Sequence, residues 1–202
     1  MTESPSYNVK KKDGNFEIRE YDDYILAQVD LEADYRNALG MGFSILANYI
    51  FGGNKKKSKI PMTTPVAGVN VSGSEKIPMT VPVTEEVVSG SEKIPMTVPV
   101  TEEKAGKEIY RISFTMPSKY TLETLPDPED SRIKFKEEKN QRMAVMRFSG
   151  RAKEDLSIKK IGELKIWLDK NGIEPRSNFI VAQYNHPAIP GFLRKNEIIV
   201  KI

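Results

Sequence analysis

The chain has 202 residues, of which 39% are apolar and 29% are charged, so its composition suits one packed domain of ordinary size. The 31 basic and 28 acidic side chains leave a net charge of +3, too small an excess to indicate a dedicated nucleic-acid-binding protein. There is no cysteine and one histidine, His186, which excludes disulfides, zinc–thiolate sites, iron–sulfur clusters and metal sites with two imidazole ligands.

Hydropathy gives no sign of a membrane segment. No stretch approaches the roughly 20 apolar residues that a membrane-spanning helix needs. The first residues also lack the basic-then-apolar order of a secretory signal. We therefore expect a cytoplasmic protein that does not bind membranes.

The N-terminal part of the chain predicts strands, one helix and further strands. Alternating apolar residues favour strands at 15–21, 24–31, 59–66 and 109–116. A helix is expected from Asp34, as N-cap, through Phe51, and two glycines close it.

The C-terminal part repeats this order. Strands are expected at 132–137, 141–148, 179–184 and 197–202. A helix from about Lys153 to Asn171 has an apolar stripe of Ile158, Ile161, Leu164 and Leu168. Two such sets indicate an α+β fold with two pseudo-symmetric halves, at about 7–105 and 109–202, within a single domain spanning 1–202. An acidic, proline-rich stretch at 125–130 connects them.

An exact internal repeat interrupts the first half. Residues 71–86 read VSGSEKIPMTVPVTEE, residues 88–103 repeat all sixteen letters, and 59–66 is a looser copy. A solenoid would carry its unit throughout the chain, so we interpret the repeat as a local duplication. Such insertions are tolerated at a surface because long loops cost little closure entropy.

Each copy has the pattern of an edge strand. In 76–83 the apolar residues share one face, whereas two of the three residues of opposite parity are prolines, which cannot donate to a neighbouring strand. The two copies could form a hairpin extension. Alternatively, either copy could occupy the native strand while the other loops out.

Two glycines lie inside the first predicted helix. Gly40 and Gly42 should each cost about 1 kcal/mol relative to alanine. Close approach of a sheet or of a flat ligand could offset that cost, and packing on a sheet is the favoured interpretation.

Residues for catalysis are not evident. His186 lies in a turn between strands, where a solvated or backbone-bonded role is favoured over a metal-ligand role. Gly52 and Gly53 are not followed by the Lys-Ser/Thr pair of a phosphate loop. No nucleophile with a base and no pair of carboxyl groups stands out, so no catalytic residue is predicted and an enzyme is not expected.

Four segments together resemble the SOUL haem-binding proteins. Residues 45–54 (ILANYIFGGN) resemble the first-helix signature of that family, and 59–66 (KIPMTTPV) its next signature, which the family often repeats once downstream. Residues 114–126 are similar to its central segment and 192–197 to its C-terminal signature. The similarity runs in order from about residue 7 to residue 202.

This resemblance implies a fold and a ligand. The fold is two βαββ-type halves that make a distorted antiparallel barrel flanked by two helices, as in small bacterial effector-binding modules. The implied function is non-catalytic binding of haem or a related tetrapyrrole beside the first helix. Some members reportedly hold the iron without a protein ligand and others have been assigned a histidine. His186, our candidate metal ligand, stands where the family more usually has a small or apolar residue or proline.

The candidate haem-binding residues come from the first helix and its surroundings. Met41, Ile45 and Tyr49 follow i, i+4, i+8 spacing and are expected to share a face, with core packing as an equal alternative. Met62 is a soft neighbour. The cations that could meet the haem propionates are Arg36, Lys55, Lys56 and Arg194.

Two other functions stay open at this point. One is a small-molecule effector or regulatory module that uses the cleft between the halves and is not specific for haem. The other is an interaction protein whose proline-rich edge strand, within 71–103, pairs with a partner or with itself and gives weak self-association.

Overall fold

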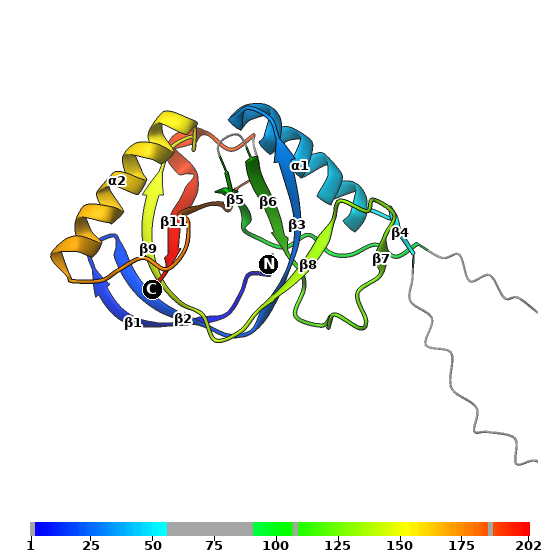
Figure 1. The fold of residues 1–202 in the computed structure, drawn as a ribbon, viewed down its shortest axis with the longest axis horizontal. Coiled ribbons are helices and arrows are strands. Elements are labelled where there is room, and N and C mark those ends of the chain that lie inside the picture. The colour runs from blue at the N-terminus through cyan, green and yellow to red at the C-terminus, as the bar shows by residue number, and fades with distance from the viewer. Residues whose placement is uncertain (1–2, 56–90, 107–108, 186–187) are drawn as a thin grey trace, which may run out of the picture.

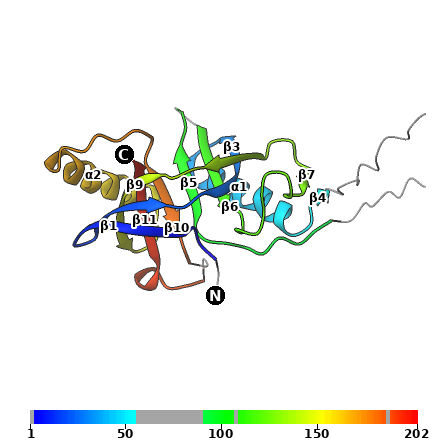
Figure 2. The ribbon, with the colours of Figure 1, turned by 90° about the horizontal axis from the view of Figure 1, so that it is seen from below.

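The computed structural model describes residues 3–55, 91–106, 109–185 and 188–202. Its main element is a strongly curled antiparallel sheet of nine strands, and both helices lie outside the curl (Figure 1). A view from below also places the sheet between the two helices (Figure 2). The α+β expectation is therefore confirmed. Within these residues no helix is long and apolar enough to cross a membrane.

The strands of the main sheet follow one spatial order. They are β1 (Tyr7–Asp13), β2 (Phe16–Tyr21), β9 (Arg142–Ser149), β11 (Lys195–Lys201), β10 (Ile180–Gln183), β5 (Val100–Lys104), β6 (Ile109–Thr115), β3 (Tyr24–Glu32) and β8 (Lys134–Glu138). A separate pair joins β4 (Asn54–Lys55) to β7 (Asp127–Pro128). The helices are α1 (Tyr35–Ile50), α2 (Glu154–Lys170) and a short 3-10 turn, η1 (Gly191–Leu193).

The order of the strands is symmetric about the centre of the sheet. The β5–β10 pair lies at the centre, and β6, β3 and β8 on one side correspond to β11, β9 and β2 on the other. The first strand of each half crosses over to the other half, because β2 pairs with β9 and β8 pairs with β3. The strand β1, which was not predicted, extends the sheet beyond β2.

Helix α1 packs closely on strands β3 and β6. The Asp34 carboxylate accepts hydrogen bonds from the backbone N–H groups of Arg36 and Asn37, which confirms the predicted N-cap. A Cβ added at Gly42 would lie 2.4 Å from Cγ1 of Ile112 on β6. Gly42 therefore permits the close packing predicted from its position, whereas a Cβ at Gly40 would meet nothing within 4 Å.

Helix α2 covers the other half of the sheet with Leu164, Trp167 and Leu168. The Trp167 ring stacks on Phe16 at a centroid distance of 5.1 Å, and its indole N–H donates to Asp13. The predicted stripe is wrong at Ile158, which is 61% exposed. Ile158 and Leu164 are six residues apart, which places their side chains about 120° apart around a helix of 3.6 residues per turn. Ile158 therefore lies off the packed face.

The second copy of the repeat supplies the central strand β5. Residues 91–99 form no strand, and β5 begins at Val100, directly after the last proline of the copy. The expectation of an edge strand is therefore wrong for this copy, because the prolines lie before the ladder rather than in it. Its predicted apolar face is also interrupted, since Ile94 is buried but Met96 is 38% exposed. The strands expected at 59–66 and 76–83 lie outside the described residues.

A buried carboxyl group lies where the two halves meet. On β5, Glu102 pairs across the ladder with Ile112 of the α1 core and Val181 of the α2 core. The Tyr35 hydroxyl contacts both Glu102 Oε1 and the carbonyl oxygen of Ala152. One hydroxyl proton cannot serve two acceptors, so both are satisfied when Glu102 is protonated and donates to Tyr35.

Burial raises the pKa of Glu102 to about 7, and the nearby Glu154 carboxylate acts in the same direction, while the Tyr35 hydrogen bond opposes them. The folded-state pKa thus lies above the ordinary value of 4.5, so the stability this group contributes is complete below pH 4.5 and is lost as pH rises through about 7.

We predict that the free energy of unfolding falls on the order of 2 kcal/mol between pH 5.5 and pH 8.5 through Glu102. Glu102→Gln should flatten that slope, because its side chain stays neutral across the range. Urea titrations at several pH values measure the effect. Glu103→Gln, one position along β5 and on the opposite face, is the control and should keep the wild-type slope. An unchanged slope in Glu102→Gln would contradict the assignment.

The two α1 glycines should respond oppositely to alanine. Gly42→Ala should destabilise the protein by about 1–3 kcal/mol, because Ile112 on β6 cannot move aside without its strand. Gly40→Ala should instead stabilise it by up to about 1 kcal/mol through helix propensity. Urea unfolding of both variants gives the comparison, and equal effects would show that the close contact is not limiting.

Candidate functional site

The outward face of α1 forms one side of a shallow groove. Its volume is about 590 Å³, within the roughly 300–1,000 Å³ of small-molecule sites. The lining residues are Arg36, Asn37, Gly40, Met41, Ser44 and Ile45 of α1, with Arg132 from the segment before β8. Three residues predicted from sequence, Arg36, Met41 and Ile45, therefore lie together.

The groove has an apolar wall and, at Gly40, a place where no side chain covers the helix backbone. Met41 is 49% exposed, and Ile45 is partly buried against the α1 core. Gly40 also lines the groove, and a Cβ there would meet nothing within 4 Å. The Ser44 hydroxyl donates to the carbonyl oxygen of Gly40 at 3.0 Å, so its hydrogen is already used within the helix. A flat apolar molecule can approach the helix backbone here.

The rim of the groove is positively charged. Arg36 and Arg132 both line it. The Arg132 guanidinium donates two hydrogen bonds to Asp130, which hold the pKa of that carboxyl below its ordinary value. The Asp34 carboxylate is held by the first amides of α1. Asp130 and Asp34 thus compensate Arg132 and the helix N-terminus, so Arg36 supplies most of the positive charge that an anion in the groove would meet.

Tyr49 does not share the face of Met41 and Ile45. Its side chain is fully buried, and its hydroxyl donates to the carbonyl oxygen of Pro126 at 3.0 Å. Each step of four residues advances about 40° beyond a full helical turn, so Tyr49 lies about 80° around the helix from Met41. Of the two alternatives weighed for Tyr49, core packing describes its position.

The other predicted cations lie away from the groove. Lys55 belongs to β4, beyond the C-terminal end of α1, whereas Arg36 is in the first turn. The Arg194 guanidinium donates to the carbonyl oxygen of Ile189 in the connection between β10 and β11. Met62, Lys56 and His186 lie outside the described residues.

Sequence reasoning missed Arg132 as a groove residue. It lies 87 positions beyond Ile45, and the sequence placed it at the start of an expected strand, at 132–137, with no role in a site. The strand exchange brings β8 next to β3, and therefore brings the residues before β8 near α1. No local pattern in the sequence indicates that contact.

The residues of the groove fit a flat amphiphilic anion such as a tetrapyrrole. The apolar wall and the opening at Gly40 suit a planar ring system, and the two guanidinium groups suit carboxylates at its edge. Among the described residues, no group of three or more His, Cys, Asp or Glu side chains could hold a bare metal ion. The structure thus describes a small α+β protein with a shallow groove on the outward face of its first helix.

Family comparison agrees with this class. The SOUL heme-binding protein family matches residues 2–201, nearly the whole chain, so the protein belongs to this family. A search of curated proteins finds no match.

Two solved structures from Listeria innocua are similar in fold. One is described as a hydrolase and has a TM-score of 0.52 and 13% identity, covering 95% of this chain and 93% of its own. The other, described as an uncharacterized conserved protein, has a TM-score of 0.53 and 14% identity, covering 92% of this chain and 91% of its own. At such identity the similarity shows the fold alone.

Proposed function

We propose that this protein binds haem or a related tetrapyrrole, without catalysing a reaction, in the groove on α1. Membership of a haem-binding family supports the ligand class. The observation that carries the location is that one groove on α1 is lined by Gly40, whose Cβ position is open, by the apolar side chains of Met41 and Ile45, and by the guanidinium groups of Arg36 and Arg132. Bound haem would supply a redox-active, Lewis-acidic iron, and the residues of the groove would hold the macrocycle.

Apolar burial and charge pairing share the binding energy. Each 100 Å² of apolar surface removed from water contributes about 2.5 kcal/mol. Association itself costs at least about 4 kcal/mol, and a shallow groove covers one face of a macrocycle only. A hydrogen bond from Arg36 to a carboxylate would add about 1.5–3 kcal/mol, whereas Arg132 would first have to exchange its pair with Asp130. We therefore expect Arg36 to matter as much as the apolar wall.

Whether a side chain of the protein ligates the haem iron is tested by a separate experiment. Of the side chains that line the groove, Met41 has a thioether, an established haem ligand. Haemin titrations of wild type, Met41→Leu and His186→Ala, followed by the Soret band, separate the cases. Unchanged spectra in both variants would support a site that holds the macrocycle without either residue on the iron.

The first prediction for the groove concerns its apolar wall. Met41→Glu should weaken haemin binding about tenfold, a loss of about 1.4 kcal/mol, because it places a carboxylate beside the macrocycle and its propionates. Ile158→Glu, an equally exposed apolar residue on α2, is the matched control and should bind like wild type. Equal affinities of the two variants would place the site elsewhere.

A second prediction compares the cations. Arg36→Gln should weaken haemin binding about tenfold through loss of a charge-assisted hydrogen bond. Lys55→Gln and Arg194→Gln, which remove the same charge outside the groove, should leave the affinity within about twofold of wild type. Titrations at low and moderate salt measure the difference. A larger loss in Lys55→Gln or Arg194→Gln would move the site to that end of α1 or to the β10–β11 connection.

A further inference from the structure

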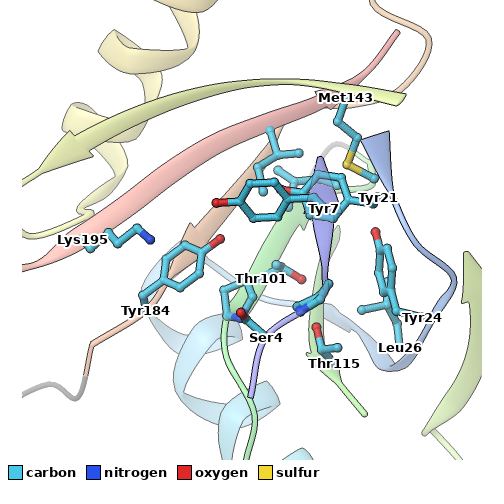
Figure 3. A pocket seen from close by; sticks show the side chains of 14 residues that line it. Ser4, Tyr7, Tyr21, Tyr24, Leu26, Thr101, Thr115, Met143, Tyr184 and Lys195 are labelled. Carbon is cyan, nitrogen blue, oxygen red and sulfur yellow. The ribbon is translucent and has the colours of Figure 1, made fainter. Parts of the chain in front are cut away.

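The inner face of the curled sheet contains a second cavity, on the opposite side of the sheet from both helices. Its volume is about 80 Å³. Four tyrosines surround it, and Thr101 and Thr115 contribute hydroxyl groups from β5 and β6 (Figure 3). The tyrosines are Tyr7, Tyr21, Tyr24 and Tyr184. Aromatic walls with hydroxyl groups at one side suit a planar ring with a polar substituent.

The charged groups behind the tyrosines neutralise one another. Arg19, fully buried, forms a two-point ion pair with Glu197 at 2.9 and 3.0 Å and donates to Glu17 at 2.7 Å. Arg147 pairs with Glu17 at 2.9 Å. Two guanidinium groups and two carboxylates therefore balance, and this network leaves no net charge for a ligand to compensate.

The tyrosine hydroxyls are fixed or kept neutral by this environment. The Tyr21 hydroxyl accepts from Arg19, and the Tyr184 hydroxyl donates to Glu197. Burial raises the pKa of Tyr21, Tyr24 and Tyr184 above the ordinary value, so the phenols remain protonated at neutral pH. Neutral phenols can face an aromatic ring or donate to an acceptor without repelling it.

One charged side chain stands at the cavity itself. Within the described part of the chain, Lys195 is the only lining residue with a formal charge, and its ammonium lies 4.7 Å from the centre of the Tyr184 ring. Lys195 is therefore the position at this cavity where an anionic substituent of a ligand is favoured.

The N-terminal segment 3–6 separates this cavity from a neighbouring groove. Ser4 and Pro5 line both hollows, as do Tyr24 and Thr115. The groove has a volume of about 360 Å³ and is bordered by acidic residues, Glu3, Asp22, Asp23 and Glu137. Residues 3–6, which we call the strap, thus lie across a single larger hollow made of the cavity and the groove.

Three hydrogen bonds hold the strap in place. The carbonyl oxygens of Glu3 and Ser6 accept from the backbone N–H groups of Val98 and Asp22, and the Glu3 carboxylate accepts from the N–H of Ser118. Glu3, Ser4 and Ser6 are exposed on the outer side. The strap is therefore a thin wall with few attachments, which a ligand can displace at small cost.

With the strap in place the cavity is smaller than the roughly 150 Å³ of a cavity that binds benzene. Once the strap moves, cavity and groove join, and the space exceeds the roughly 300 Å³ at which small-molecule sites begin. We propose that this hollow binds a small planar aromatic acid, of one or two rings, with its ring among the tyrosines, its carboxylate at Lys195, and the strap as a displaceable cover. The acidic border of the groove opposes the reverse orientation.

Calorimetric titration with 2-naphthoate tests the proposal in the full chain and in two opened forms. A deletion of residues 1–6 removes the strap, and Glu3→Ala removes one attachment while keeping the chain length. Both should bind 2-naphthoate at least about fivefold more tightly than wild type, because the cost of displacement is reduced. Glu20→Ala, which removes an exposed ion pair to Lys10, is the control and should bind like wild type.

Further titrations test which ligand charge the cavity prefers and where the ligand binds. Lys195→Gln should weaken 2-naphthoate binding about threefold, and the cation 2-naphthylmethylammonium should bind about tenfold more weakly than the acid. Saturating 2-naphthoate should leave haemin affinity unchanged, since the α1 groove lies on the other face of the sheet. Absence of saturable binding by both opened forms, tighter binding of the cation, or competition with haemin would each overturn the proposal. A failure of haemin binding alone would leave it standing.

Discussion

The exchange of strands between the two halves is the constraint on which the other features depend. Because β2 pairs with β9 and β8 pairs with β3, neither half completes its own part of the sheet. Each helix consequently packs on a layer that contains strands from both halves, and the sheet curls around a common inner face. The same exchange brings Tyr21 and Tyr24, at the two ends of the short β2–β3 link, to the inner cavity and brings Arg132 beside α1.

The two faces of the sheet deal with buried charge in different ways. On the inner face, Arg19 and Glu197 are both fully buried, and their ion pair is completed by further hydrogen bonds that offset the cost of desolvation. On the helix-covered face, Glu102 has no cation beside it among the described contacts, and burial raises its pKa to about 7. Pairing is insensitive to pH near neutrality, whereas protonation is not, so the junction of the halves is the pH-dependent part of the fold.

Most of the elements were predictable because one face of each is buried. Alternation located β2 and β3, and the Asp34 cap located the start of α1. The strand β1 was missed because all seven of its residues are exposed, so no apolar alternation marks it. The central position of β5 was missed because the prolines of the repeat dominate its pattern, although they end before the strand begins. At the candidate site, spacing identified Met41 and Ile45 but not the rotation that buries Tyr49, and no local signal indicated Arg132.

The two glycines of α1 illustrate how the site depends on the fold. Each has the same cost in helix propensity, which close approach of either a sheet or a flat ligand could offset. Two residues along a helix turn the chain by about 200°, so the glycines face nearly opposite directions and cannot serve the same neighbour. Gly42 lies against Ile112 and sets how closely α1 approaches the sheet, while Gly40 faces the groove, where no protein atom lies close enough to explain it. Packing on the sheet therefore accounts for Gly42 only, and the ligand that we propose for the groove is what would account for Gly40.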